Sequence, residues 1–192
     1  MSHLDLPGSE GEHEMQKTFG TQKQAESFYK TQMRDKLAFK MQAFISEQEM
    51  VFISTSDKNG ECDCSLRTGE AGFVVVIDEK RIAYPEYKGN GVLASTGNIS
   101  ENPHIGLLFI DFFRDKVGLH VNGKAQIIDN ESMRLLLNQE SFDLNQEKKC
   151  QFWTLVEVEE AYIHCSKNIP VLQKATTETQ KNYPIDYFEL QE

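Results

Sequence analysis

Two short segments of the sequence carry the side chains best suited to binding an anion. In residues 61–67 the side chains of an extended strand alternate between two faces, so Asp63, Ser65 and Arg67 share one face. A hydroxyl and a planar guanidinium two residues apart suit a phosphate held near a sheet surface. The alternative is a surface arginine paired with Asp63 or Glu61. Both interpretations stay open from this segment alone.

The second segment, residues 84–91, lies between a predicted strand and a predicted helix. Gly89 and Gly91 allow close approach of the backbone, free amides at a helix start attract anions, and Lys88 adds a positive charge. The segment matches neither the P-loop nor the Gly-x-Gly-x-x-Gly fingerprint. It therefore predicts either one half of a phosphate site or a turn with a solvated lysine.

Cysteine and histidine supply two further candidates. Cys62 and Cys64 lie on the strand face opposite Arg67, which predicts that they point into the core as small hydrophobic residues. A thiol or metal site built from Cys62, Cys64, His164 and Cys165 is the alternative. His164 ends the last predicted strand, where it acts either as a proton donor near a ligand or as a structural residue with one hydrogen bond.

The elements that must position these residues are mostly short strands. Hydrophobic spacing predicts one broken helix or two short ones within residues 21–49, and further helices at 92–100 and 131–139. Alternation and turn residues predict strands at 49–55, 61–67, 73–77, 81–84, 105–110, 118–128 and 152–165. The fold class is mainly β with flanking helices, as an antiparallel barrel or an α+β fold.

Length and composition indicate one globular domain. Of 192 residues, 20 are Lys or Arg and 30 are Asp or Glu, which gives a net charge of −10 and disfavours nucleic acid as a partner. We expect a disordered lead-in at 1–17, the domain at 18–167 and a tail at 168–192. No apolar stretch is long enough for a membrane span, and the acidic start is unlike a secretory signal, so we expect a cytoplasmic protein with no membrane partner.

Taken together, these segments resemble the FMN-binding split barrels related to pyridoxamine 5'-phosphate oxidase, in particular an uncharacterised flavin-nucleotide-binding subgroup. The order and spacing of the matching segments matter more than any one of them. They are residues 51–57, 63–67, 83–90, 98–99, 101–109, 120–125 and 160–165.

The resemblance implies a six-stranded antiparallel split β-barrel that forms a homodimer with FMN at the subunit interface. It implies that Arg67 and Lys88 bind the FMN phosphate, that Ser65 and Asn90 hydrogen-bond nearby, and that Tyr84 and Pro85 lie along the isoalloxazine or ribityl chain. It also implies that His164 lies near the flavin, where the oxidases have an aromatic residue. A dianionic phosphate needs cations and several donors, which agrees with the physical interpretation of the two segments.

The chain departs from the oxidases at its end, where no arginine follows Arg134, and near Gly118, where no glutamine is present to contact the flavin. We therefore do not expect pyridoxamine phosphate oxidation. The function predicted is an FMN-dependent oxidoreductase that acts on a small molecule, with an electron donor such as NAD(P)H. The alternative is a non-catalytic module on the same barrel that binds or senses flavin or heme.

Overall fold

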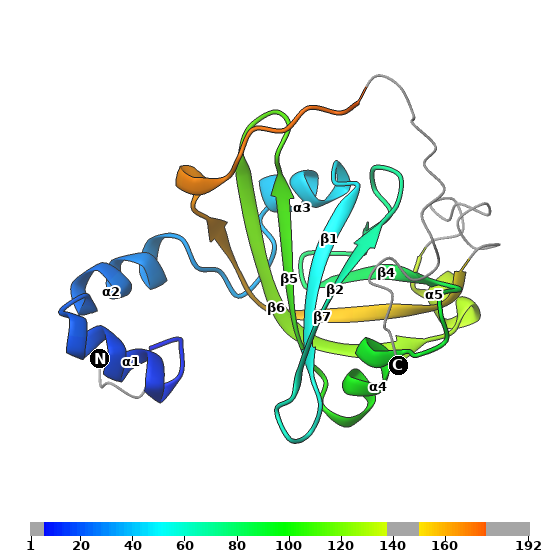
Figure 1. The fold of residues 1–192 in the computed structure, drawn as a ribbon, viewed down its shortest axis with the longest axis horizontal. Coiled ribbons are helices and arrows are strands. Elements are labelled where there is room, and N and C mark those ends of the chain that lie inside the picture. Colours follow the sequence, from blue (N-terminus) through cyan, green and yellow to red (C-terminus); the bar gives the residue numbers. More distant parts are fainter. Residues whose placement is uncertain (1–5, 138–149, 176–192) are drawn as a thin grey trace, which may run out of the picture.

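The computed structural model describes residues 6–137 and 150–175 (Figure 1). Its helices are α1 (Glu10–Phe19), α2 (Gln22–Thr31), α3 (Phe39–Ser46), α4 (Ala94–Glu101) and α5 (Asn130–Leu136). Its strands are β1 (Met50–Ser56), β2 (Cys62–Thr68), β3 (Val75–Val76), β4 (Arg81–Tyr87), β5 (His104–Asp111), β6 (Val117–Ile128) and β7 (Cys150–His164). The predicted order of helices and strands from residue 21 onward is confirmed.

The strands form one antiparallel sheet in the order β2-β1-β5-β6-β7-β4-β3, which curls into a split barrel. The sheet contains seven strands, one more than the resemblance implies, because the two residues of β3 pair with β4. The longest pair, β6 and β7, shifts register between Asn122 and Gly123. A Cβ on Gly123 would lie 2.0 Å from the Glu157 carbonyl oxygen, so this close approach of two backbones requires glycine.

The sheet begins and ends at β2 and β3, and no backbone ladder joins β2 to β4 among the described residues. We call this junction the seam. It is crossed by side chains of β2 that meet β4 and α4, which lies near one end of the barrel (Figure 1). The main hydrophobic core fills the interior behind the seam and includes Ile53, Tyr84 and Phe109. A second, smaller core around Trp153 lies where β4 and β7 meet α5.

The cysteines of β2 correct one prediction. Cys62 and Cys64 are exposed rather than buried, and Leu66 on the same face is 50% exposed. The register places Arg67 opposite Val51, whose side chain is fully buried, so the polar face of β2 is the one that turns inward. The inward polar groups find partners across the seam, which leaves the cysteine face on the outside of the sheet.

The N-terminal segment corrects a second prediction. Residues 10–17 were expected to lack regular structure, but they belong to α1, which lies beside α2 away from the barrel (Figure 1). Ser9 caps the helix by accepting a hydrogen bond from the Glu12 amide, and Gly20 ends it in the left-handed conformation. Tyr29 of α2 contacts Glu12 and Gln16, so the two helices stabilise each other.

The start of the C-terminal tail lies on the barrel. After a 3-10 turn at Ser166–Asn168, the Leu172 amide donates to the Phe112 carbonyl and Lys174 pairs with Glu49. The remaining tail, 176–192, lies outside the described residues. No helix among those described combines the length and apolar character needed to cross a membrane.

Candidate functional site

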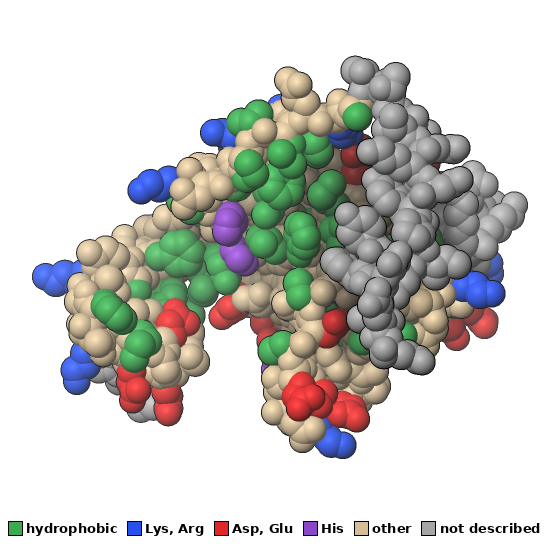
Figure 2. Space-filling view, viewed as in Figure 1, with side chains coloured by type: hydrophobic (Ala, Val, Ile, Leu, Met, Phe, Trp, Pro, Cys, Tyr) green, Lys and Arg blue, Asp and Glu red, His purple; other side chains and the backbone are tan. Residues whose placement is uncertain are grey.

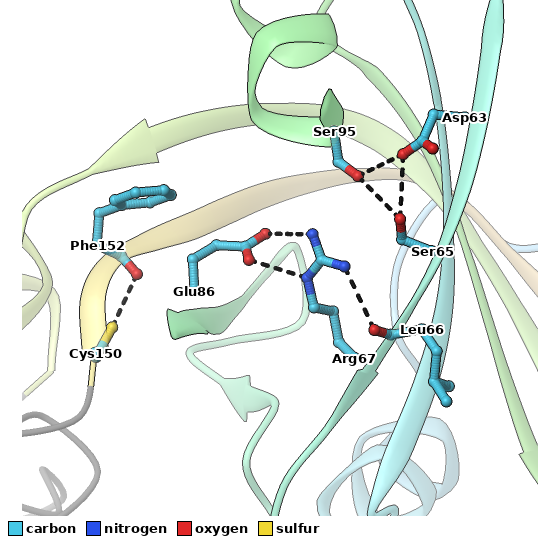
Figure 3. A network of polar contacts seen from close by, with 8 residues as sticks. All are labelled: Asp63, Ser65, Leu66, Arg67, Glu86, Ser95, Cys150 and Phe152. Atoms are coloured by element: carbon cyan, nitrogen blue, oxygen red, sulfur yellow. Dashed lines mark hydrogen bonds and ion pairs between the residues drawn. The ribbon is translucent and has the colours of Figure 1, made fainter. Parts of the chain in front are cut away.

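Arg67 bridges the seam from β2 to Glu86 on β4 (Figure 3). Its Nε donates to Oε2 of Glu86 at 2.9 Å, and its Nη2 donates to Oε1 at 3.0 Å, so the ion pair is bidentate. The two side chains are only 22% and 10% exposed. Glu86 therefore takes the place that sequence reasoning gave to Asp63 or Glu61, and it fixes the orientation of the guanidinium.

The guanidinium uses only one of its edges for this ion pair. Along the other edge, Nη1 has a single partner among residues 6–137 and 150–175, the Leu66 carbonyl at 3.4 Å. A planar guanidinium can bind one anion on each edge, because its five N–H donors form two separate forks. Arg67 can thus hold Glu86 and still present donors to a second anion.

A second polar group lies next to Arg67 on the inward face of β2 (Figure 3). The Ser95 hydroxyl, from α4, donates to Oδ2 of Asp63 at 2.7 Å, and the Ser65 hydroxyl donates to the same oxygen at 3.2 Å. Ser65 was expected to meet a phosphate, but the structure directs its hydroxyl at a carboxylate. Sequence reasoning missed Ser95 because its partners are 30 and 32 residues away along the chain.

The segment that follows β4 carries Lys88 and Asn90 a few residues beyond Glu86, the partner of Arg67. Both are exposed, and Lys88 follows Glu86 by two residues. Oδ1 of Asn90 accepts a hydrogen bond from the Val92 amide at 3.0 Å, which orders the turn, and Gly91 adopts the positive φ of 84° that the turn requires. No ion pair recorded within the described chain includes Lys88.

Tyr84 and Pro85 lie inside the molecule rather than at its surface. The Tyr84 side chain is fully buried in the main core, and Pro85 is buried as well. Burial raises the pKa of the Tyr84 hydroxyl above its ordinary value. That hydroxyl and the one of Thr154, its neighbour on β7, have no hydrogen-bond partner of good geometry in the described part of the chain. In this conformation Tyr84 supports β4 from within the core and does not reach a ligand outside it.

The charges at the seam decide what it can bind. Arg67 pairs with the Glu86 carboxylate, and a second carboxylate, Asp63, lies farther along the same face of β2; the oxygens of both already accept hydrogen bonds. A dianionic phosphate does not fit against these carboxylates, because like charges in close contact repel each other. It fits the Nη1 edge of Arg67, and Lys88 in the exposed segment after β4 supplies a second cation. The residues present therefore fit the FMN phosphate at the outer side of the seam.

His164 ends β7 as predicted, but it lies on the face of the sheet opposite to Arg67. Cross-strand partners place five side chains in one row on the outer face of the sheet, which we call the outer row: Leu66, Phe52, Leu108, His120 and Tyr162. His164 is next to this row, and its Nδ1 lies 2.8 Å from Nε2 of His120. Arg67 is on the inward face, so the structure does not bring His164 to the phosphate residues of the same chain.

The histidines lie in a largely apolar surface (Figure 2). Burial, with a smaller contribution from the neighbouring His164, lowers the pKa of His120 below its ordinary value. The metal version of the alternative built on Cys62, Cys64, His164 and Cys165 finds no support in the geometry, since no group of three or more His, Cys, Asp or Glu side chains is placed to hold a metal ion within the described residues.

Comparison with protein families agrees with this architecture. Residues 37–165, which include every strand of the sheet, match the model of the pyridoxamine 5'-phosphate oxidase family. The chain belongs to this family. Comparison with curated proteins gives no match.

Similar folds are found among solved structures. A putative pyridoxamine 5'-phosphate oxidase from Lactobacillus delbrueckii is 18% identical, with a TM-score of 0.49, covering 69% of this chain and 99% of that one. HupZ of Group A Streptococcus is 19% identical, with a TM-score of 0.48, covering 66% and 93%. A putative pyridoxamine 5'-phosphate oxidase from Listeria innocua is 18% identical, with a TM-score of 0.46, covering 65% and 94%.

Proposed function

We propose that this protein binds FMN at the outer side of the seam and is an oxidoreductase acting on a small molecule, with NAD(P)H as the candidate electron donor. The observation that carries the proposal is the guanidinium of Arg67, which Glu86 holds by one edge while Nη1 on the other edge has one partner in the described chain, the Leu66 carbonyl oxygen at 3.4 Å. Membership of the family supports flavin as the ligand.

Each residue of the seam has a distinct part in this proposal. Arg67 and Lys88 bind the phosphate, and Asn90 orders the turn that carries Lys88. Glu86 is a positioning residue, since it fixes the plane of the guanidinium. Ser65 reaches the phosphate only if its hydroxyl leaves Asp63. The bound flavin supplies the redox chemistry, so the protein needs no nucleophile of its own.

The proposal includes a homodimer with FMN at the subunit interface. The outer row crosses five strands. Within the described chain Leu66 is exposed and the other four side chains are half-buried, and Figure 2 shows hydrophobic side chains gathered on this face. A continuous apolar surface of this kind is typical of an interaction site. A second copy seated on it would cover the exposed side of Leu66.

The experiment is a titration of the flavin-free protein with FMN, followed by flavin fluorescence. We expect one FMN per chain, and we expect Arg67→Ala to weaken binding by about 1.5 to 3 kcal/mol through loss of charge-assisted hydrogen bonds. Arg67→Lys keeps the charge but loses the two-edged geometry, so it should also weaken binding. Lys88→Ala should have a smaller effect. Unchanged affinity in Arg67→Ala would remove this residue from the site.

Riboflavin, which lacks the phosphate of FMN, separates the contribution of the phosphate to binding affinity from that of the flavin ring. If the seam recognises the phosphate, riboflavin should bind more weakly than FMN to the wild-type protein. Riboflavin should also bind with about equal affinity to the wild-type protein and to Arg67→Ala. Cycling of bound flavin by NAD(P)H and an acceptor would support the oxidoreductase. A flavin that is reduced but does not turn over would favour the second candidate, a non-catalytic flavin-binding module.

A further inference from the structure

Two hydrogen-bonded histidines lie on the surface that the proposed dimer covers. His120 on β6 belongs to the outer row, and His164 at the end of β7 is its diagonal neighbour on the same face. Nε2 of His120 lies 2.8 Å from Nδ1 of His164, and the ring centroids are 5.0 Å apart. This is the one hydrogen bond recorded for either ring among the residues that the structure describes. We call these two residues the histidine pair.

The rings are surrounded mainly by aromatic and apolar side chains. Tyr162 stacks on His120 with ring centroids 4.8 Å apart and planes 20° from parallel, and Phe28 of α2 packs edge-on against Tyr162. On the other side, β5 places Leu108 opposite His120. The hydrogen bond between the two rings therefore lies in a surface that offers little to stabilise a positive charge.

The titratable groups that flank the pair are few. Besides Tyr162, β7 carries Glu160 on the same face, where Asn122 donates to its carboxylate at 3.3 Å. Beyond the end of the strand, Cys165 and Lys167 are exposed. The pKa of His120 is lowered below its ordinary value, with burial as the larger cause and the neighbouring His164 as the smaller one. The environment of the pair thus favours its uncharged form.

The hydrogen bond determines what each added proton does. Two neutral rings share one hydrogen between the facing nitrogens. A first added proton leaves this hydrogen bond intact but places a positive charge in the apolar surface. A second puts a hydrogen on both facing nitrogens, so the hydrogen bond is lost and the two cations repel each other. A second copy seated on the outer row removes water from the rings, which makes either charged form costlier still.

We infer that the histidine pair makes association of the two chains pH-sensitive, so that the dimer forms when the pairs are uncharged and separates when they take up protons. The inference rests on the dimer of the proposed function. In a symmetric dimer the same patch of both chains lies in the contact, so two pairs are covered together. Because separation then takes up protons, the dissociation constant rises as the pH falls through the ordinary range of histidine, near about 6.5.

The overall charge of the protein predicts the opposite trend. Each chain has a net charge of −10 at pH 7, so two copies repel each other. Acidification neutralises part of this charge and by itself strengthens association. A dimer that weakens on acidification therefore reports a group in the contact that has to stay uncharged, and not the overall charge.

The test is the dimer dissociation constant of the full chain, measured by sedimentation at pH 7.5 and pH 5.5 at one ionic strength. For the wild-type protein we expect it to rise about tenfold or more in acid. In the double variant His120→Gln/His164→Gln, two amides keep a hydrogen bond without titrating, so the change should stay below about twofold. His104→Gln is the matched control, because this exposed histidine hydrogen-bonds to Asn102 and should leave the wild-type pH dependence in place.

Circular dichroism at both pH values verifies that each variant is folded. If the double variant does not fold, His120→Gln replaces it and should likewise reduce the pH dependence. A wild-type dimer that is equally strong or stronger at pH 5.5 would overturn the inference and leave the dimer in place. The same change in the glutamine variant as in the wild-type protein would also overturn it. A wild-type mass of one chain at pH 7.5 would remove both the dimer and the inference.

Discussion

At the scale of single residues, the site depends on which partner each charged group meets. Arg67 and Glu86 are 19 positions apart in sequence and form a bidentate pair, whereas sequence reasoning gave Arg67 only neighbours on its own strand. His120 and His164 are likewise far apart in sequence, by 44 positions, and meet only in the folded chain. Residue type and alternation predicted that Arg67 and Ser65 share a face. They could not predict partners that only the closed barrel brings together.

The seam ion pair should contribute to stability. In the flavin-free protein we expect Glu86→Ala to lower the free energy of unfolding by about 1 to 3 kcal/mol, because it leaves a largely buried guanidinium without its partner. The measurement is urea denaturation followed by circular dichroism. Glu47→Ala is the control, since the side chains of Glu47 and its ion-pair partner Arg114 are 54% and 66% exposed, so solvent screens the pair and its loss should change stability little. A similar decrease in the free energy of unfolding in both variants would show that the seam ion pair stabilises the protein no more than an exposed ion pair does.

At the scale of helices and strands, hydrophobic periodicity predicted most elements because each buries one side. The hairpins at residues 49–67 and 73–84 and the helix that ends before Pro103 are confirmed. Two errors have physical reasons. The acidic sequence of α1 was interpreted as disordered, although Ser9 three residues before Glu12 is the pattern of a capped helix start. For β2, alternation defines which residues share a face, but only the sheet order decides which face turns inward.

The bulge in the β6–β7 pair should tolerate no side chain. We expect Gly123→Ala to destabilise the protein by about 3 kcal/mol, because its Cβ would meet the Glu157 backbone, which cannot move aside as a flexible side chain would. Gly97→Ala is the matched control, since this position in α4 has open space and alanine favours helix by about 1 kcal/mol. Thermal unfolding of both variants distinguishes them. A neutral Gly123→Ala would mean that the two strands separate at the bulge at little cost.

At the scale of the whole molecule, the fold separates two kinds of surface. The inward face of β2 and the segment after β4 carry the charged groups, while the outer row presents apolar and aromatic side chains with the histidine pair at one side. The family and the seam support a ligand at the first surface, and the outer row supports contact with a second copy, whose residues would complete the proposed interface around FMN. The order of the segments predicted an antiparallel barrel or an α+β fold, and the family resemblance implied the split barrel, whereas this division of surfaces was not predictable.

The proposed homodimer can be tested by the molecular mass of the protein in solution. Leu66→Lys places a charge on the outer row, so we expect the mass measured by light scattering to fall from that of two chains to that of one at low micromolar concentration. Leu135→Lys is the control, because Leu135 of α5 is 84% exposed but lies away from the outer row, and its mass should not change. A wild-type protein that already has the mass of one chain would contradict the dimer.

The seam also gives the barrel a preferred place to open. Elsewhere each long strand is joined to its neighbours by a continuous ladder, so parting them would break many hydrogen bonds at once. Between β2 and β4 the recorded polar link is the Arg67–Glu86 pair, with Ser95 of α4 holding Asp63 beside it. Local opening at this line exposes the interior while the β6–β7 hairpin stays folded. Amide hydrogens on β2 should then exchange with solvent ahead of those on β6, without global unfolding.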